Sequence, residues 1–144
     1  MRVLLVRHAR AGDRESWRGD DRLRPLNERG RRQADRLAPL LDERGATGLL
    51  SSPYVRCVQS FEPAAAELGL PLEERDELAE GVRREDVLGL LETFAPDSVP
   101  ALCTHGDVIA ELLGPETKCK KGATWVLEVG GDRISPLRYL PPPA

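Results

Sequence analysis

The sequence of 144 residues has few of the groups that hold small folds together covalently or through a metal ion. It contains three cysteines, Cys57, Cys103 and Cys119, and two histidines, His8 and His105. The cysteines are odd in number, form no CxxC pair and lack zinc-ligand spacing with the histidines. We therefore expect three reduced thiols, no bound metal and no organic cofactor.

Long apolar runs and an excess of positive charge are also missing. No run approaches the ~20 apolar residues that span a bilayer, and the short aliphatic run after Arg2 falls far below a signal-peptide core. The formal net charge of −3 argues against an extended surface for nucleic acid or anionic membranes. We expect a cytoplasmic protein whose partners include neither nucleic acid nor a membrane.

Nucleotide-binding and metalloprotease signatures are absent as well. The sequence holds no GxGxxG, Walker, HExxH or Nudix motif and no internal repeat. Hydrophobic residues make up 40% of the chain and charged residues 31%, which is typical of a globular domain with a well-solvated surface. The length predicts one domain over residues 1–140, followed by a frayed proline-rich tail at 141–144.

Two apolar runs end directly in a histidine. The aliphatic residues 3–6 precede Arg7 and His8, and a second run over 99–104 precedes His105. Such runs predict buried strands of an α/β sheet, and ligands in these folds lie at the carboxyl ends of the strands. A single histidine at a strand end is more often structural than catalytic, so the pair carries more weight than either alone.

The remaining pattern predicts alternating helices and strands. Asn27 is placed to cap a helix that Pro39 kinks or ends early and that stops by Gly45. Pro53 suits the start of another helix, with Arg56 in its first turn, where the helix dipole favours an anion. Further strands are expected near 48–52 and 70–73, helices near 87–94 and 106–113, and a closing hairpin over 125–140 whose last strand Pro136 places at the sheet edge.

Four motifs, in order along the chain, resemble those of the histidine phosphatase superfamily, which has the phosphoglycerate mutase-like fold. They are LVRHA at 5–9, PLNERG at 25–30, SSPYVR at 51–56 and THG at 104–106. The resemblance runs from about residue 2 to residue 140. It implies an α/β fold, a three-layer αβα sandwich in which helices cover both faces of a mostly parallel central sheet.

The same resemblance implies phosphoryl transfer through a phosphohistidine. His8 would be the nucleophile, and Arg7, Arg56 and His105 would hold the phosphoryl group without a metal ion. The general acid is expected in the acidic stretch 73–85, where alignment of the motifs favours Glu80, with Glu77 in reserve. A solvated acidic loop without a catalytic role is the alternative for this stretch.

Two subgroups are similar to the chain and imply different substrates. The short length resembles small phosphohistidine phosphatases of the SixA type, which implies a phosphorylated protein. WRGDD at 17–21 and KGATWVL at 121–127 are similar to the C-terminal histidine phosphatase domain of MutT-like Nudix hydrolases, which implies a small phosphorylated substrate such as a nucleotide. A third interpretation is a non-catalytic module that binds a phosphorylated ligand and regulates a Nudix-type enzyme.

Residues 9–24 form a loop rich in glycine, aspartate and arginine with no helical or alternating period. This loop is expected beside the site as a possible lid, and Arg18 is the favoured substrate contact among its arginines. The other candidates to hold an anionic substrate are Arg10, Arg14, Arg22 and Arg24. Lys121, in the basic stretch 118–121, is expected to bind the distal part of a polyanionic substrate. Ordinary solvated surface, with the arginines paired to nearby carboxylates, is the alternative for both segments.

Overall fold

The short apolar runs form the strands of one central sheet in the computed structural model, which describes residues 1–143. The strands are β1 (Arg2–Arg7), β2 (Gly48–Ser51), β3 (Leu72–Glu74), β4 (Pro100–Thr104), β5 (Thr124–Gly130) and β6 (Arg133–Leu140). Their order across the sheet is β3-β2-β4-β1-β5-β6. The first four strands are parallel, and the β5–β6 hairpin pairs antiparallel to β1.

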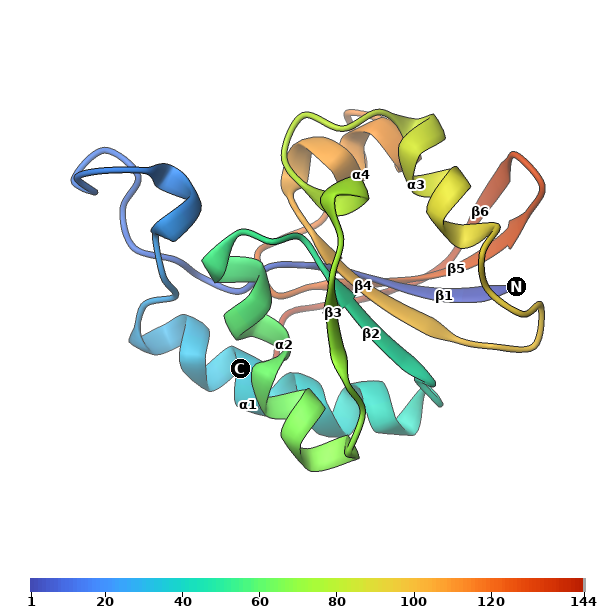
Figure 1. The fold of residues 1–144 in the computed structure, drawn as a ribbon, viewed down its shortest axis with the longest axis horizontal. Coiled ribbons are helices and arrows are strands. Elements are labelled where there is room, and N and C mark those ends of the chain that lie inside the picture. The colour runs from blue at the N-terminus through green and yellow to red at the C-terminus, as the bar shows by residue number, and fades with distance from the viewer. Residues whose placement is uncertain (144) are drawn as a thin grey trace.

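Helices cover both faces of this sheet. The α-helices are α1 (Glu28–Glu43), α2 (Val55–Leu68), α3 (Arg84–Leu91) and α4 (Gly106–Leu113), and two short 3-10 helices are η1 (Asp21–Leu23) and η2 (Asp76–Leu78). Figure 1 shows α1 and α2 on one side of the sheet and α3 and α4 on the other. The predicted three-layer α/β sandwich is thereby confirmed.

Alternation along β1 divides the core into two layers. Leu4 and Val6 pack in the cluster that contains the buried faces of α1 and α2. Val3 and Leu5 pack in the opposite cluster, with α3 and α4. Because both faces of β1 are covered, its apolar run is continuous rather than alternating. β1 lies between β4 and β5, and the residues that follow it are therefore rigidly placed.

Helix ends largely follow the sequence signals. The Asn27 side chain accepts a hydrogen bond from the Gly30 backbone, as expected of a cap, and α1 stops just before Gly45, whose φ is +77°. Of the two alternatives at Pro39, a kink or an early end, the early end is wrong, because α1 continues through this exposed residue to Glu43. The carbonyl that proline leaves without a partner belongs to Asp35, which is also exposed and open to water.

The hairpin and the sheet edges agree with expectation. β6 forms one edge of the sheet and β3 forms the other. The pairing of β5 with β6 shifts register between Val126 and Leu127, and Leu127 pairs with Pro136. Residues 141–143 have no regular structure, and Ala144, part of the predicted tail, lies outside the described residues. Within residues 1–143, no helix has the length and apolar character required to cross a bilayer.

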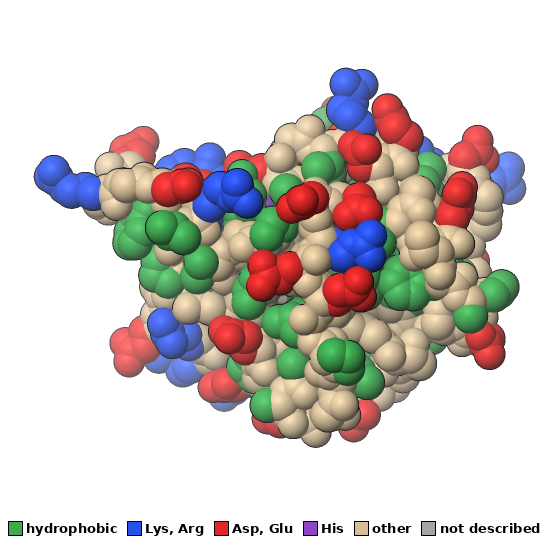
Figure 2. Space-filling view, in the orientation of Figure 1, with side chains coloured by type: hydrophobic (Ala, Val, Ile, Leu, Met, Phe, Trp, Pro, Cys, Tyr) green, Lys and Arg blue, Asp and Glu red, His purple; other side chains and the backbone are tan. Residues whose placement is uncertain are grey.

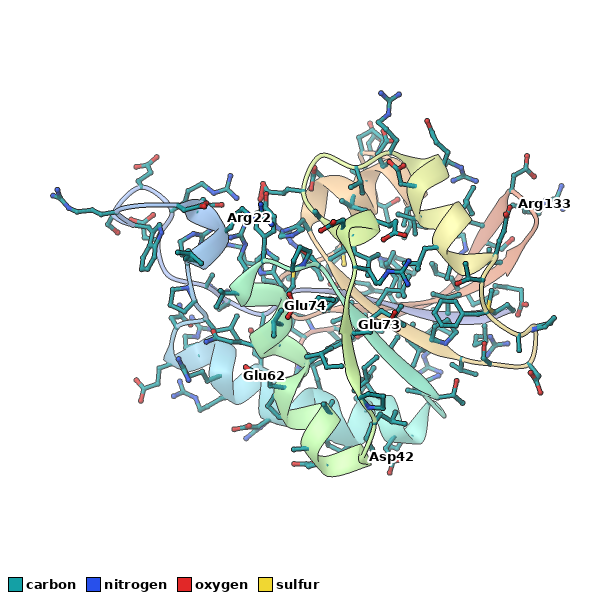
Figure 3. All side chains as sticks on the ribbon, viewed as in Figure 1. Arg22, Asp42, Glu62, Glu73, Glu74 and Arg133 are labelled. Carbon is teal, nitrogen blue, oxygen red and sulfur yellow. The ribbon has the colours of Figure 1, made fainter. Side chains whose placement is uncertain are left out.

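The segment 9–24 differs in part from a structureless loop. An isolated bridge joins Ala11 to Leu26 at its base, and η1 lies near its end. In Figure 1 this segment, in blue, projects from the body of the molecule on the side where α2 begins. Arg22 on η1, labelled in Figure 3, stacks its guanidinium 5.4 Å from the centre of the Tyr54 ring, which links the segment to the start of α2.

Candidate active site

The two histidines lie side by side at the carboxyl ends of adjacent strands. His8 follows β1 and His105 follows β4, and the register pairs Arg7 with Thr104. The centres of the imidazole rings are 5.5 Å apart. Both side chains are buried, and histidine is almost hidden in the surface view of Figure 2. The structure thus brings together two residues that are far apart in the sequence.

The His8 ring is held in a single orientation. Its Nδ1 lies 2.8 Å from the carbonyl oxygen of Ala9. Because a carbonyl only accepts, Nδ1 carries the proton and Nε2 keeps its lone pair. Burial lowers the pKa of His8 from 6.5 to about 3, and the proximity of His105, Arg56 and Arg7 adds to this shift, although the Ala9 contact opposes it. The neutral ring is the form that a nucleophile requires.

Arg7 is fixed between the strand ends and α4. Its Nη1 donates a hydrogen bond to the Cys119 carbonyl at 2.9 Å. The guanidinium packs flat against Gly106, where an added Cβ would lie 3.0 Å from the Arg7 Cζ. Gly106 is therefore needed for this close approach, as is usual where backbone meets a functional group. The Arg7 Nε is buried and has no hydrogen-bond partner among residues 1–143.

Arg56, in the first turn of α2, is fully buried. Its Nη1 donates to the Asp21 carbonyl at 2.9 Å, and its Nη2 contacts Asp21 Oδ2 at 3.1 Å and Glu80 Oε2 at 2.7 Å. Its guanidinium also lies 4.9 Å from the centre of the Tyr54 ring. The Arg56 Nε, like that of Arg7, is buried and unpartnered in the described part of the chain. Two carboxylates therefore meet a cation predicted to hold a phosphoryl group.

His105 is the N-cap residue of α4 and is oriented by Ser52. Its Nε2 lies 2.8 Å from the Ser52 hydroxyl, while its Nδ1 is buried without a hydrogen-bond partner in residues 1–143. The nearest acidic atom to Nδ1 is Glu80 Oε2, at 3.9 Å. Ser52 was not predicted from the sequence as a site residue, although it belongs to the SSPYVR motif.

Glu80 and Glu77 occupy different environments. Glu80 lines a cavity of about 510 Å³ together with Arg7, His8 and His105. Glu77 forms an ion pair with Arg75 at 2.8 Å, and this hydrogen bond lowers the pKa of the Glu77 carboxyl. The structure therefore places only Glu80 beside the histidines. The Gly81 backbone, next to Glu80, donates to Asp107 Oδ2 at 2.8 Å, which ties the acidic segment to α4.

Of the two further residues predicted to bind substrate, Lys121 lies beside the site and Arg18 does not. Lys121 lines a cavity of about 510 Å³ that also contains His8 and Arg14. Arg18 is exposed and lines neither cavity that contains His8. Arg14 and Arg24 are the loop arginines that line a cavity with His8, and the Arg14 Nη2 lies 3.4 Å from Glu80 Oε1.

Sequence reasoning missed Asp21 and Asp107 as site residues, and among the loop arginines it favoured Arg18 over Arg14. Asp21 ties the loop to Arg56 and Arg24, at 3.1 and 2.9 Å, and these arginines help to lower the pKa of its carboxyl even though partial burial opposes the shift. Asp107 follows the THG motif directly, which was the one available signal for it. Nothing local distinguishes Asp21 or Arg14 from the other charged residues of the loop.

This arrangement is suited to an anionic group with tetrahedral oxygens. Three buried nitrogen atoms, Arg7 Nε, Arg56 Nε and His105 Nδ1, have no hydrogen-bond partner in residues 1–143. Arg7 and His105 line one cavity with His8 and Glu80, and Arg56 contacts Glu80 at 2.7 Å. Buried donors of this kind are usually satisfied, so their lack of partners at one site indicates a site for an acceptor-rich ligand.

Comparison with known proteins identifies relatives of the chain. The model of the histidine phosphatase superfamily (branch 1) matches residues 3–82, which include His8, Arg56 and Glu80. The 8-oxo-(d)GTP phosphatase of Mycolicibacterium smegmatis (strain ATCC 700084 / mc(2)155) is 39% identical over 155 residues. That match covers 98% of this chain and 48% of the relative. The chain thus spans about half the length of this curated relative.

Solved structures show the same fold over the whole chain. The protein histidine phosphatase SixA complexed with tungstate has a TM-score of 0.82 at 21% identity, covering 99% of this chain and 97% of that one. A putative phosphohistidine phosphatase SixA from Agrobacterium tumefaciens has a TM-score of 0.74 at 26% identity, and the match covers 99% of this chain and 98% of that one. A mycobacterial glucosyl-3-phosphoglycerate phosphatase has a TM-score of 0.78 at 18% identity, and the match covers 97% of this chain and 98% of that one.

Proposed function

The chain belongs to the histidine phosphatase superfamily, and we propose from this premise that it is a phosphatase whose nucleophile is His8. The observation that supports this most directly is the set of unpartnered buried nitrogens of Arg7, Arg56 and His105 around the His8 ring. A non-catalytic module would need these donors to bind a phosphorylated ligand, but not a neutral imidazole with Nε2 unprotonated.

In the first step, His8 Nε2 attacks the phosphorus atom. The new N–P bond forms as the bond from phosphorus to the leaving oxygen breaks. Glu80, once displaced from Arg56 and protonated from solvent, donates that proton to the leaving oxygen. Arg7, Arg56 and His105 neutralise the phosphoryl oxygens, which otherwise repel a nucleophile. The dianionic group also raises the low pKa of His8 as it arrives, which makes the imidazole more nucleophilic during attack.

In the second step, water replaces the histidine. Glu80, now ionised, takes a proton from the water molecule, whose oxygen attacks phosphorus as the N–P bond breaks. Inorganic phosphate leaves, and His8 returns to its neutral form with the proton still on Nδ1. The Glu80 carboxylate contacts Arg56 at 2.7 Å, so the phosphoryl oxygens must displace this carboxylate before it can act.

Two substrate classes follow from the relatives. The predicted phosphohistidine protein is supported by the fold that the chain shares with SixA structures. A small phosphorylated molecule, such as a nucleotide, is supported by the relative at 39% identity, whose name gives 8-oxo-(d)GTP as its substrate. We place the nucleotide class first, because the higher identity extends over nearly the entire chain. A link to a Nudix enzyme stays a prediction.

The test is phosphate release by wild type and His8→Ala, in a chelator, from a phosphohistidine protein, nucleoside mono-, di- and triphosphates, and an aryl phosphate. Wild type is expected to turn over at least one of them, and His8→Ala none. Denaturation during turnover should trap an acid-labile phosphoryl group on the peptide that contains His8. A wild type inert towards the whole panel, or an active His8→Ala, would overturn the proposal.

His8→Asn provides the matched control for folding. Asparagine retains an N–H that can donate to the Ala9 carbonyl but cannot act as a nucleophile. It should bind orthophosphate by calorimetry and melt near the wild-type temperature, yet release no phosphate. The loss of turnover is then assigned to the chemistry of residue 8 rather than to misfolding.

A further inference from the structure

A third cavity shares Arg7 with the two cavities that contain His8. Its volume is about 560 Å³. Five cations and one amide line most of its wall, namely Arg7, Arg10, Arg29, Lys120, Lys121 and Gln33. The catalytic cavity differs in this respect, because Glu80 and Asp107 contribute carboxylates to its wall. No acidic residue of the described part of the chain lines this third cavity. We call it the cationic cavity.

The charges of the cationic cavity are not neutralised internally. Across residues 1–143, none of its five cations forms an ion pair, whereas Arg14, Arg24 and Arg56 around the catalytic pocket all do. Partial burial, followed by the charges of Arg7, Arg24, Arg10 and Arg14, lowers the pKa of Lys121. Like charges held close together repel each other, and a bound anion removes that repulsion.

The segments that carry these cations are fixed by a buried side chain. Gln33, only 8% exposed, accepts a hydrogen bond from the Arg10 backbone at 3.0 Å and contacts the Lys121 carbonyl at 3.4 Å through its amide nitrogen. The Gly122 backbone also contacts both the Arg7 and His8 carbonyls at 3.0 Å. The wall of the cationic cavity is therefore anchored to the same backbone that presents His8.

The cationic cavity and the catalytic pocket can be occupied by one molecule. Arg7 lines both of them, and Lys121 lines both the cationic cavity and the neighbouring cavity that contains His8 and Arg14. An anion bound by Arg10, Arg29 and the two lysines would thus belong to the same substrate as a phosphoryl group at His8. Adjoining cationic sites of this kind match a chain of linked phosphates.

We propose that the cationic cavity is a second phosphate subsite, and that the substrate is a small polyphosphate ester of the nucleoside di- or triphosphate class. This inference rests on the proposed function, because it assumes that the other phosphoryl group lies at His8. The protein substrate suggested by the SixA fold requires one phosphoryl site, and it leaves the cationic cavity without a ligand.

The test compares the affinities of orthophosphate and tripolyphosphate, measured by calorimetry at fixed ionic strength. Orthophosphate fits one subsite, whereas tripolyphosphate can reach both. Wild type should bind tripolyphosphate about tenfold or more tightly than orthophosphate, because charge-assisted hydrogen bonds are added. The double variant Arg29→Gln/Lys120→Gln should lose most of this preference. With a nucleoside diphosphate as substrate, its KM should rise about tenfold.

The control is Arg36→Gln/Arg138→Gln, which removes the same two charges from exposed positions on α1 and β6 that line neither cavity. It should keep the wild-type preference for tripolyphosphate. Equal affinities for the two anions in wild type, or equal losses in both double variants, would overturn the subsite. Efficient turnover of a phosphohistidine protein without any preference for tripolyphosphate would do so as well.

Failure of the proposed function gives a different result. In that case no substrate is turned over, but the preference for tripolyphosphate and its dependence on Arg29 and Lys120 can still be measured, because calorimetry requires no catalysis. Failure of the subsite leaves turnover intact and removes only the preference. The two measurements therefore separate the two proposals.

Discussion

The Glu80 carboxylate contacts the fully buried guanidinium of Arg56 at 2.7 Å, while its Oε2 lies 3.9 Å from the His105 imidazole. One carboxylate thus contacts one of the proposed phosphoryl-binding residues and lies near another. In the proposed mechanism, an arriving phosphoryl group competes with Glu80 for Arg56. Once displaced, Glu80 is released beside the reacting group, where the proposed mechanism needs a proton donor.

Glu80→Gln should lower kcat about 10²- to 10³-fold, because the amide cannot transfer a proton. KM should not rise, since a neutral amide competes less with the phosphoryl group for Arg56. Steady-state kinetics with a substrate whose leaving group is poor measures both effects. Glu77→Gln is the matched control, because Glu77 is paired with Arg75 outside the site, and it should retain nearly wild-type kcat. A loss in Glu77→Gln alone would reverse the assignment.

Asp107→Ala should lower kcat about tenfold or more by releasing the Gly81 backbone, since small misplacements of catalytic groups are costly. Asp107 is thus predicted to position Glu80. A double-mutant cycle checks this role: in the Glu80→Gln background, Asp107→Ala should have little further effect on kcat.

The control for Asp107 lies on the same helix. Glu111→Ala removes a carboxylate that accepts a hydrogen bond from the Arg84 backbone, away from the histidines. It should lower stability slightly and leave kcat unchanged. Additive losses in the double-mutant cycle would show that Asp107 acts independently of Glu80.

The lowered pKa of His8 predicts how stability varies with pH. The unfolded chain binds a proton on this histidine below about 6.5, whereas the folded protein does so only below about 3. The unfolded state therefore binds more protons between these values, and this contribution to stability falls as pH falls from about 6.5 towards 3. His8→Asn should lack this part of the dependence in denaturant titrations at a series of pH values.

The same property can be followed directly by imidazole NMR. Residue 8 should remain in the neutral Nδ1–H form throughout the neutral pH range, with no titration near 6.5. Comparison with the spectrum of His8→Asn assigns its resonance, because the chain has only two histidines. An ordinary titration midpoint near 6.5 would contradict the predicted charge state of the nucleophile.

Gly30→Ala should destabilise the protein by about 1–3 kcal/mol. A Cβ at this position would lie 1.9 Å from the Arg10 carbonyl oxygen, so the backbone beside the cationic cavity must move. Chemical denaturation measures the loss. Gly89→Ala is the opposite case, because nothing lies within 4 Å of its Cβ position in the exposed face of α3. Gly89→Ala should raise the free energy of unfolding by about 0.5–1 kcal/mol. A decrease would contradict the open space described around Gly89.

The sequence predicted the strands and the first-turn position of Arg56 because those features depend on short local patterns. Continuous apolar runs are the signature of covered strands, and Asn27 and Gly45 mark helix ends by local chemistry. The alternative that α1 ends early at Pro39 was wrong, because solvent around the helix can satisfy the carbonyl that proline leaves without a partner. Local signals thus predict which helices and strands form more accurately than they predict the residues at which these elements begin and end.

The contacts that assemble the site could not be predicted in the same way. Asp21 meets Arg56, and Asp107 meets Gly81, across gaps in the chain that no periodic pattern spans. The acidic stretch offered several carboxylates of similar chemistry, and only the tertiary structure distinguishes Glu80, beside the histidines, from Glu77, beside Arg75. The catalytic roles of these residues remain predictions for the experiments above.

The pairing of β1 with β4 also has a consequence for how the protein acquires activity. These neighbours begin at residues 2 and 100, so the chain must close a very large loop before His8 and His105 can meet. Such non-local contacts form slowly compared with helices. In a refolding experiment, the helical circular dichroism signal should therefore return before phosphate release does. The time at which activity returns would then report when β4 pairs with β1.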